Sequence, residues 1–562
     1  MNKNENQSTK PDPTKDPFLI MITIIVVVAG IAKNWGRIMW AYELNCDKVF
    51  FAAYVGFLVL LYLKLKKNFD DSKEDRKSLL RLKRLRARES SRREENYRRE
   101  SIPKNQFETP PLPTRSEERT TQSATTSPQI TEIKIGNRLS DNYPVYLSDK
   151  KRTGHVQVLG ATGRGKTESV VIPWMVQDFR YKRNSVILID GKGDPEISSR
   201  FKEYAGEKNV LVFNPMDSRS STINPLRFGT PQQITDRIMS SFEFQDPYYK
   251  AVQMEGLGTV VALITNSEKL VTFKKIDRAL SNMDYLAKLS EESSDEGLKR
   301  RARGLITMKE DVRIGQFSGL RSQISPFVFG ELALLVNGGG REISLSEILR
   351  IQTNRPPKAA LILLPTLIYQ EAARVIGRMC LQELAYGVGY RSSFFPDAPF
   401  TSVFLDEFSS FAYRGFELIL NKARSANVAL HLSHQSTGDL DAVSPEFARL
   451  LNTNTNIKCL LGLNDPDTAD FFARHIGTRT VEKMTEKSIE NKSWLSSGDE
   501  KTGMKSVREA ESYKVHPNRL KNLTAGEGVI HIPTKPESVT EEIQFCDLHA
   551  LAIEPITDEE VA

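Results

Sequence analysis

Residues 160–167 have the composition and spacing of a phosphate-binding loop. The segment reads Gly-Ala-Thr-Gly-Arg-Gly-Lys-Thr and fits the pattern G-x-x-x-x-G-K-[ST]. Glycines let such a loop wrap phosphates with its backbone N–H groups, the lysine reaches the β- and γ-phosphates, and the final hydroxyl binds Mg²⁺. We therefore predict that ATP and Mg²⁺ bind to these eight residues: Gly160, Ala161, Thr162, Gly163, Arg164, Gly165, Lys166 and Thr167.

An acidic pair, Asp406 and Glu407, is the second candidate. It ends an apolar run that begins at Thr401 and is typical of a buried strand. A nucleotide site needs a carboxylate in this position, so we expect Asp406 to bind Mg²⁺ through water and Glu407 to polarise the attacking water. The alternative is a strand that merely ends in acidic turn residues.

Gln435 follows another apolar strand, 428–434. A glutamine at such a strand end senses the γ-phosphate or orients water in other NTPases. The alternative is a polar residue that only ends a strand. His431 and His434 lie inside the strand, and we predict that both are neutral strand residues and not catalysts.

Arg424 stands eleven residues before Gln435, at the end of an amphipathic helix that begins at Phe416. A plain surface charge is the favoured interpretation. In an oligomeric ATPase, Arg424 could instead reach the nucleotide of a neighbouring subunit. Because Arg424 precedes the strand that ends at Gln435, we expect it near the same edge of the sheet.

The elements that must position these residues alternate between strands and helices. Apolar runs predict strands at 155–159, 185–190, 359–365, 401–407 and 428–435, and helices at 168–179 and 370–386. Pro173 falls inside the first helix and predicts a kink there. The alternation predicts an α/β fold with a doubly wound parallel sheet, in which ligands bind at the carboxyl ends of the strands.

Residues 231–344 have a different pattern, which is helical, polar and poor in strands. We interpret them as an all-α domain inserted into the nucleotide-binding domain. The alternative is a set of peripheral helices that belong to the same domain.

Two apolar runs, 18–32 and 49–63, lie near the N-terminus. Each is shorter than the ~20 residues that span a bilayer core, but Lys33 and Lys64 can snorkel and flanking aromatic residues can lie at the interfaces. A buried core helix and a cleaved signal peptide are the alternatives. We predict a two-helix transmembrane hairpin with both ends in the cytoplasm, because an arginine-rich segment follows the second run.

The basic character of the chain is local. Residues 64–100 hold 15 Lys and Arg against 8 Asp and Glu, an excess that equals the net charge of +7 for all 562 residues. We favour a stop-transfer segment against anionic lipid over a collar that faces DNA. Residues 101–129 are rich in Pro, Ser, Thr and Glu and predict a disordered linker. The four cysteines are scattered, which argues against a disulfide framework or a zinc site.

The chain resembles the TraG/TraD family of coupling proteins from conjugative type IV secretion systems. The matching stretches are HVQVLGATGRGKT, VILIDGKGDPE, VFNPMDSRSSTINPL, FLDEFSS, ARSANVALHLSHQS and FFARHIGTRT. The resemblance covers about 131–536 and the two-span anchor. The chain departs from the family in its brief C-terminal segment after Pro536.

The resemblance implies a RecA-like ATPase that forms a homohexamer and moves single-stranded DNA with its relaxase from the relaxosome towards the secretion channel. It implies a bacterial inner-membrane protein with several spans and a cytoplasmic ATPase domain. In family terms, Lys166 and Thr167 resemble the Walker A pair and Asp406 and Glu407 the Walker B pair. Gln435 resembles the glutamine of motif III, and Arg424 resembles the trans-acting arginine.

Two other classes of protein remain as alternatives. One is a different membrane ATPase, either an FtsK-like translocase of double-stranded DNA or a secretion ATPase for protein substrates. The other is a docking scaffold that binds nucleotide only to control its assembly, although Lys166, Asp406, Glu407 and Gln435 are all intact. The expected division of the chain is 1–17 cytoplasmic tail, 18–67 transmembrane hairpin, 68–130 basic segment and linker, 131–230 first part of the ATPase domain, 231–344 all-α domain, 345–545 second part of the ATPase domain and 546–562 C-terminal tail.

Overall fold

The computed structural model describes residues 131–268, 270–349, 356–395, 398–486, 505–534 and 538–556. The two predicted membrane spans, the basic segment and the linker lie outside these residues. Within them, no helix combines the length and the apolar character needed to cross a membrane.

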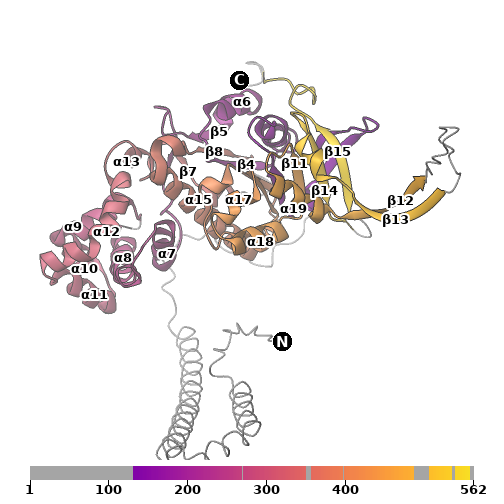
Figure 1. Ribbon diagram of the computed structural model, residues 1–562. Coiled ribbons are helices and arrows are strands. Elements are labelled where there is room, and N and C mark those ends of the chain that lie inside the picture. The colour runs from indigo at the N-terminus through magenta and orange to yellow at the C-terminus, as the bar shows by residue number, and fades with distance from the viewer. Residues whose placement is uncertain are drawn as a thin grey trace, which may run out of the picture. The chain divides into compact units, whose positions relative to one another are not determined.

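A mixed sheet of 11 strands forms the centre of the described part (Figure 1). Seven neighbouring strands, from β11 to β5, run parallel, and the remaining four are antiparallel to their neighbours. In order across the sheet, the strands are β2 (Pro144–Ser148), β1 (Glu132–Arg138), β15 (Val539–Phe545), β14 (Glu527–Ile532), β11 (Ile457–Leu461), β3 (Val156–Leu159), β10 (Val428–His434), β9 (Thr401–Asp406), β4 (Ser185–Asp190), β8 (Ala359–Leu363) and β5 (Val210–Phe213).

The five predicted strands are confirmed, and they occupy five adjacent positions, β3-β10-β9-β4-β8. Their continuous apolar runs follow from burial on both faces, as in parallel sheets covered by helices. In β4, Ile187 and Ile189 point into one hydrophobic cluster, whereas Val186 and Leu188 point into the other. The expectation of a wholly parallel sheet is wrong at the side where β14, β15, β1 and β2 are added.

Helices cover both faces of the sheet. The face to which Ile187 and Ile189 point is called the first face, and the opposite one is the second. The long helix α15 bends at Gln370, whose φ of 40° and ψ of −117° are not helical. The predicted helix at 370–386 is therefore confirmed but longer, because a short turn from Thr366 precedes the bend. The helices on this face are α14 (Leu345–Leu349), α15 (Thr366–Phe394), α16 (Glu417–Ser425), α17 (Thr437–Asp441) and α18 (Pro445–Asn454), with the turn η5 (Phe408–Ser410).

The second face carries the helix that follows the phosphate-binding loop. It begins as the π-helical segment η2 (Lys166–Val171), continues as α5 (Ile172–Val176) and ends as η3 (Gln177–Tyr181). The backbone N–H of Ile172 bonds to the carbonyl of Thr167, five residues earlier. The predicted helix is thus confirmed, with a change of helix type at Ile172, directly before Pro173, which lacks an N–H to donate. Near it lie α4 (Asp149–Arg152), α6 (Pro195–Ala205) and η4 (Glu207–Asn209).

The chain between β5 and β8 is mostly helical. The helices of this segment lie between two short strands, β6 (Thr222–Ile223) and β7 (Glu342–Ile343), which pair in parallel. Its buried side chains belong to the same hydrophobic cluster as the first face of the sheet, and the boundaries 231–344 of a separate domain stay a prediction. The helices are α7 (Pro231–Ser241), α8 (Pro247–Glu268), α9 (Phe273–Ser281), α10 (Met283–Glu292), α11 (Glu296–Ile306), α12 (Glu310–Val328) and α13 (Leu332–Leu335).

Polar caps explain where several of these helices begin. Thr230 and Gln233 form a capping box at α7, and Thr272, Asn282 and Asp295 accept backbone N–H groups at the starts of α9, α10 and α11. Each such cap satisfies a donor that the helix leaves unpaired.

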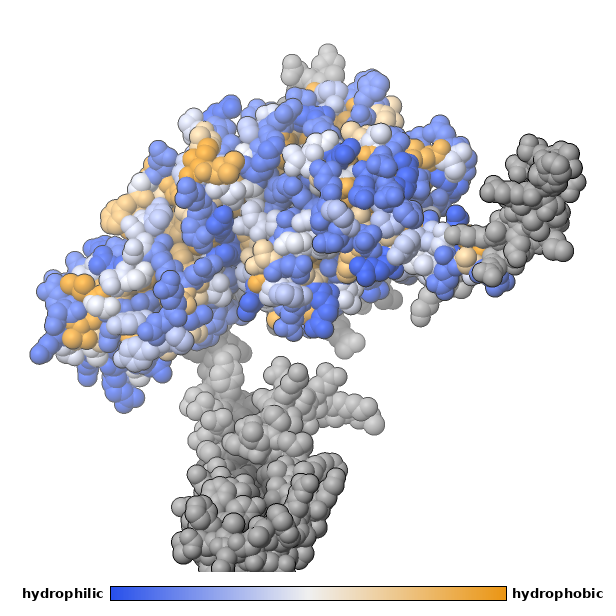
Figure 2. All heavy atoms as spheres, viewed as in Figure 1, coloured by the Kyte–Doolittle hydropathy of each residue, from blue (hydrophilic) through white to orange (hydrophobic). Residues whose placement is uncertain are grey.

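Two further elements complete the described part. The strands β12 (Thr478–Glu486) and β13 (Lys505–Tyr513) pair as a long antiparallel ribbon that leads away from the central sheet (Figure 1). The helices α19 (Pro466–Ile476) and α20 (Pro517–Lys521) enclose a small third hydrophobic cluster beside β11. Polar and charged residues cover most of the visible described surface (Figure 2).

Candidate nucleotide site

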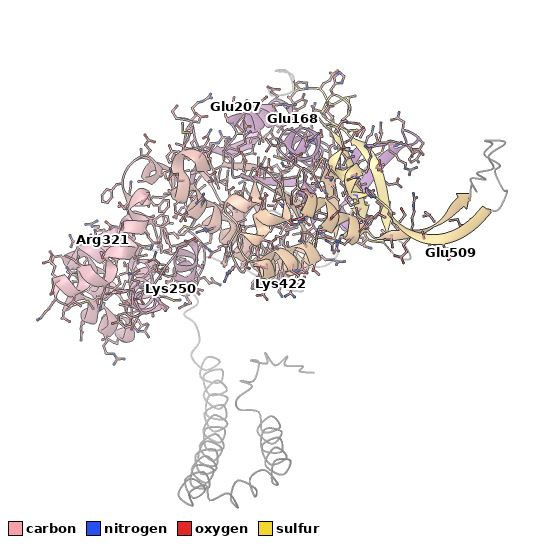
Figure 3. The ribbon with its side chains drawn as sticks, in the orientation of Figure 1. Glu168, Glu207, Lys250, Arg321, Lys422 and Glu509 are labelled. Atoms are coloured by element: carbon pink, nitrogen blue, oxygen red, sulfur yellow. The ribbon has the colours of Figure 1, made fainter. Side chains whose placement is uncertain are left out.

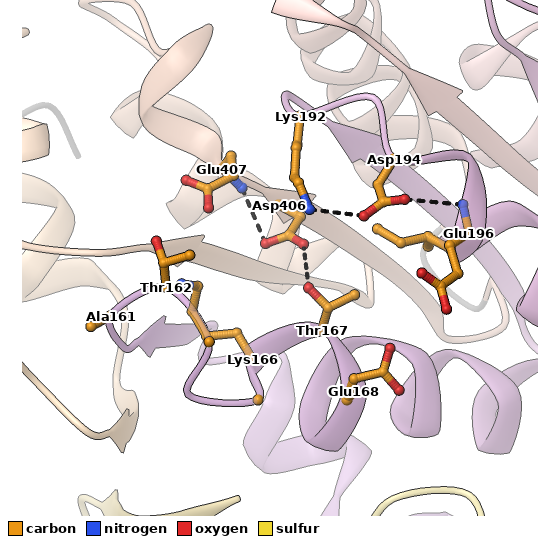
Figure 4. Close-up of a pocket in the computed structure, with 13 residues that line it drawn as sticks. Ala161, Thr162, Lys166, Thr167, Glu168, Lys192, Asp194, Glu196, Asp406 and Glu407 are labelled. Atoms are coloured by element: carbon orange, nitrogen blue, oxygen red, sulfur yellow. Dashed lines mark hydrogen bonds and ion pairs between the residues drawn. The ribbon is translucent and has the colours of Figure 1, made fainter. Parts of the chain in front are cut away.

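A cavity of about 240 Å³ opens at the carboxyl ends of the central parallel strands (Figure 4). The phosphate-binding loop forms one wall, and the turns that follow β4 and β9 form the opposite wall. This is the edge at which parallel α/β sheets bind their ligands. The lining residues are Ala161, Thr162, Gly163, Gly165, Lys166, Thr167, Glu168, Lys192, Asp194, Glu196, Ile197, Asp406 and Glu407.

Glycines shape the loop where the backbone turns. Gly163 and Gly165 have φ angles of 76° and 90°, a region that side chains with a Cβ rarely adopt. Gly165 also lies against another backbone, because a Cβ there would be 3.3 Å from the nitrogen of Gly526. The side chain of Lys166 is buried in the loop, and its Nζ donates to the carbonyl of Gly160 at 2.6 Å.

Two oxygen ligands meet across the cavity. The hydroxyl of Thr167 lies 3.2 Å from Oδ2 of Asp406, and the backbone N–H of Glu407 donates to Oδ1 of the same carboxylate at 3.1 Å. Mg²⁺ prefers hard oxygen ligands and retains several waters. The hydroxyl and the carboxylate therefore fit the predicted Mg²⁺ site, because they offer such oxygens on one side of an open cavity.

A chain of polar contacts joins Glu407, Gln435 and Thr162. Nε2 of Gln435 lies 3.3 Å from both carboxylate oxygens of Glu407, and the hydroxyl of Thr162 donates to Oε1 of Gln435 at 3.3 Å. Glu407 has a left-handed φ of 46°. Strained conformations of this kind occur preferentially at functional sites. The structure thus brings two of the three candidate catalytic side chains together beside the phosphate-binding loop.

Asp190 lies at the end of β4, directly beside Asp406 in the register of β9. Its carboxylate accepts the backbone N–H groups of Lys192 at 2.9 Å and Asp194 at 2.7 Å. Burial, reinforced by the charge of Asp406, raises the pKa of Asp190 to about 7. Asp190 consequently fixes the turn that carries two lining residues of the cavity.

Sequence reasoning gave no role to Lys192 and Asp194, although both line the cavity. They form an ion pair of 2.9 Å opposite the phosphate-binding loop (Figure 4). Their position directly after a parallel strand was a signal for a site residue, because ligands bind where such strands end.

Two family models match the chain. One, described as type IV secretory system conjugative DNA transfer, matches residues 114–248. The other, described as the TraM recognition site of TraD and TraG, matches residues 401–523. These two matches support a coupling protein of the TraG/TraD type.

A curated relative of this chain is the type 4 coupling protein DotL of Legionella pneumophila. The two are 24% identical over 406 residues, which cover 60% of the chain and 51% of DotL. The chain therefore spans about half the length of the curated relative that it matches.

Solved structures of the coupling protein TrwB share the fold. An unbound form of TrwB lacking its N-terminal 70 residues has a TM-score of 0.54 at 15% identity, covering 74% of the present chain and 90% of the TrwB chain. TrwB in complex with ADP and Mg²⁺ has a TM-score of 0.52 at 14% identity, covering 74% and 90%.

Two predicted site residues, Gly160 and Arg164, do not line the cavity. The Nη1 of Arg164 donates to the carbonyl of Leu523 at 3.1 Å, so this side chain fastens the loop to the segment before β14. Gly160 does not line the cavity either, but its carbonyl accepts from Lys166. The other six residues of the loop line the cavity.

Arg424 lies at the end of the sheet where the parallel strands β9 and β10 begin, opposite the end that carries the cavity. Its carbonyl accepts the N–H of Asn427, and the carbonyl of Asn427 accepts the N–H of Thr401, where β9 begins. The expectation that Arg424 lies at the edge with Gln435 is wrong, because β10 separates the two residues and advances about 3.3 Å per residue. Figure 3 labels Lys422, on the same helix as Arg424, and Glu168, which follows the loop, on opposite sides of the described ribbon.

The two strand histidines are buried and bonded. His431 lies 4.2 Å from the ring of Phe404 in a stacked contact, and burial lowers its pKa well below the ordinary value. Burial lowers the pKa of His434 to about 4. Both rings are therefore neutral at physiological pH, as the sequence predicts.

Proposed function

We propose that the chain is an Mg²⁺-dependent ATPase. The observation that carries the proposal is the meeting of the Thr167 hydroxyl and the Asp406 carboxylate, 3.2 Å apart, in a cavity lined by the phosphate-binding loop. Lys166 and the loop backbone would bind the phosphates, and Thr167 and Asp406 would hold Mg²⁺. When bound, Mg²⁺ neutralises charge on the β- and γ-phosphates.

The remaining residues would activate water. Glu407 lines the cavity and would accept a proton from the attacking water. Gln435 contacts both oxygens of Glu407 and would orient that water and the carboxylate. Arg424 cannot serve the nucleotide of its own subunit from the far edge of the sheet, so any catalytic role would be played across a subunit boundary.

We further propose that hydrolysis serves a conjugative type IV secretion system, in which the protein links the relaxosome to the channel and moves single-stranded DNA. The TraG/TraD family models, the relative DotL and the fold of TrwB support this proposal. A homohexamer would place Arg424 of one subunit at the nucleotide of the next.

A DNA-stimulated ATPase assay tests the proposal. The full-length protein should hydrolyse ATP with Mg²⁺, and single-stranded DNA should stimulate it more than double-stranded DNA. Preferential stimulation by double-stranded DNA would favour an FtsK-like translocase. An ATPase rate that neither form of DNA changes would favour a protein-secreting ATPase. Binding of ATP without any hydrolysis would favour the alternative of a docking scaffold that binds nucleotide only to control its assembly.

The proposed location is the bacterial inner membrane, with a two-span hairpin and a cytoplasmic ATPase domain. The apolar runs 18–32 and 49–63 support it. In intact cells from which the outer membrane has been removed, a membrane-impermeant thiol reagent should label Cys46 in the loop between the runs. Labelling that occurs only after lysis contradicts this topology.

A further inference from the structure

A cluster of buried polar side chains joins the neighbouring strands β3, β10 and β11, and none of its members lines the cavity. Its members are less than a tenth exposed and come from strands β3, β10 and β11 and from the end of α18 and the turn that follows it: Gln157, His434, Asn452, Thr455 and Lys458. Gln157 and Lys458 stand directly opposite each other in the parallel pair of β3 and β11. β3 leads into the phosphate-binding loop, and β10 leads into Gln435.

Lys458 is the most constrained member of the cluster. Its Nζ lies 2.7 Å from Oε1 of Gln157, 2.7 Å from the carbonyl of Asn452 and 2.6 Å from the carbonyl of Thr455. All of these acceptors are neutral. Burying an amine among neutral groups costs free energy, so stability alone does not explain a lysine at this position.

The bonds of Lys458 fix the orientation of Gln157. Because Oε1 of Gln157 faces the lysine, its amide nitrogen faces the other way, where it donates to Oδ1 of Asn452 at 2.7 Å and contacts Nε2 of His434 at 2.8 Å. An imidazole that accepts at Nε2 carries its proton on Nδ1. Nδ1 of His434 accordingly donates to the carbonyl of Ser436 at 2.8 Å.

This chain of bonds reaches the residues on both sides of Gln435. His434 precedes it, and the carbonyl that accepts from His434 belongs to Ser436. On the outer side, the N–H groups of Gln435 and Ser436 donate to Oδ2 of Asp439 at 2.9 and 3.0 Å. The backbone at Gln435 is thus held from within by the buried cluster and from without by α17, while its side chain contacts Glu407.

We propose that Lys458 is a positioning residue for Gln435, acting through the side chains of Gln157 and His434. The inference rests on the proposed ATPase function. In the relay, the lysine selects one orientation of the Gln157 amide, the amide selects the Nδ1–H form of His434, and the imidazole holds the turn that aims Gln435 at Glu407.

The test is a double-mutant cycle with the full-length protein. Lys458→Met removes the donor but keeps an unbranched side chain, and Gln435→Ala removes the side chain to be positioned. Lys458→Met should lower kcat for ATP about tenfold and change KM less than twofold, because only the placement of Gln435 is lost. In the Gln435→Ala background, the same substitution should have almost no further effect.

Lys182→Met is the matched control, because Lys182 is also buried but contacts Asp149 and Asp178 on the other face of the sheet. Any loss that it causes should be equal with and without Gln435. If Lys458→Met does not fold, His434→Asn replaces it as the test variant. Asparagine keeps a donor for the carbonyl of Ser436 but loses the bond between the imidazole and the amide of Gln157. It should show the same dependence on Gln435.

Equal losses from Lys458→Met, or from His434→Asn, in both backgrounds would overturn the inference and leave the cluster a structural one. An unchanged kcat would overturn it as well. Failure of the proposed function has a different signature: the wild-type protein itself would then show no turnover above that of Lys166→Ala.

Discussion

The hydroxyl oxygen of Thr167 lies 3.2 Å from a carboxylate oxygen of Asp406, although 239 residues separate the two in sequence. Thr167 is the last residue of the phosphate-binding loop and lies in the first turn of the helix that follows, and Asp406 ends β9. The inserted helical segment lies between them in the chain. The parallel pairing of β10 with both β3 and β9 brings these two distant residues to one edge of the sheet.

Thr167→Ala should abolish ATP hydrolysis, with a loss of at least about 100-fold, because the metal site loses one of its two protein oxygens. Steady-state phosphate release with Mg²⁺ measures the effect. Thr167→Ser keeps the hydroxyl and should retain most of the activity. This variant therefore distinguishes the loss of the Mg²⁺ ligand from the loss of the methyl group. Lys166→Ala should be as inactive as Thr167→Ala, and wild-type turnover in either alanine variant would sink the site assignment.

Glu407→Gln should bind ATP normally and turn it over about 10²- to 10⁴-fold more slowly, because the amide keeps the shape of the side chain but cannot accept a proton. Binding of a fluorescent nucleotide and single-turnover hydrolysis measure the two properties separately. Glu446, which is exposed on α18, provides the control, since Glu446→Gln makes the same chemical change away from the cavity. Normal hydrolysis by Glu407→Gln would mean that another group activates water.

The central part of this fold is predictable from the sequence because its strands are buried on both faces. Continuous apolar runs identify β3, β4, β8, β9 and β10, and the loop and carboxylates follow from what stands at their ends. Asp406 and Glu407 were found in this way. The same rule, applied to the end of β4, would also have indicated Lys192 and Asp194.

The remaining strands carry weaker signals. β11 reads Ile-Lys-Cys-Leu-Leu, and its lysine suggests an exposed position. In the structure Lys458 is fully buried, with acceptors on the distant Gln157 and on Asn452 and Thr455 just before β11. Strands β14 and β15 pair with residues far away in the chain, so their place at the sheet depends on tertiary contacts. The position of Arg424 was predicted wrongly although the sequence does indicate it. A residue just before a strand lies where that strand begins, and Gln435 follows the other end of the same strand.

The buried Lys458 should make stability depend on pH. Burial lowers its pKa to about 7, against an ordinary value of ~10.4 in the unfolded chain. Between these values the unfolded chain binds a proton that the folded chain does not. The free energy of unfolding should therefore rise with pH, by at most about 1.4 kcal/mol per unit, while the cost of the buried charge is fully present below pH 7.

Thermal unfolding of the wild-type protein and Lys458→Met at pH 7 and pH 9 checks this expectation. The Tm of the wild-type protein minus the Tm of the variant should be larger at pH 9 than at pH 7. The histidines near Lys458 do not interfere, because the pKa values of His434 and His531 are about 4 and that of His475 is also lowered by burial. A constant difference in Tm between the two proteins would contradict a lowered pKa of Lys458.

Arg424→Ala should bind ATP normally and hydrolyse it very slowly if the arginine serves a neighbouring subunit. Its side chain is exposed at the edge where β9 and β10 begin, away from its own cavity. In a ring, such an edge can face the γ-phosphate of the next subunit. Arginines that act in this way contribute ~10³–10⁵ to kcat in other NTPases.

Mixed rings distinguish this role from a structural one. Subunits with Arg424→Ala and subunits with Lys166→Ala are both inactive alone, but some mixed interfaces pair an intact phosphate-binding loop with an intact arginine, so partial activity should return. Lys422→Ala, on the same helix, is the control for general positive charge and should need no rescue. If mixed rings assemble and stay inactive, Arg424 does not act across the subunit boundary. Because its own cavity is beyond reach, its effect on hydrolysis would then come from supporting the fold at the edge where β9 and β10 begin.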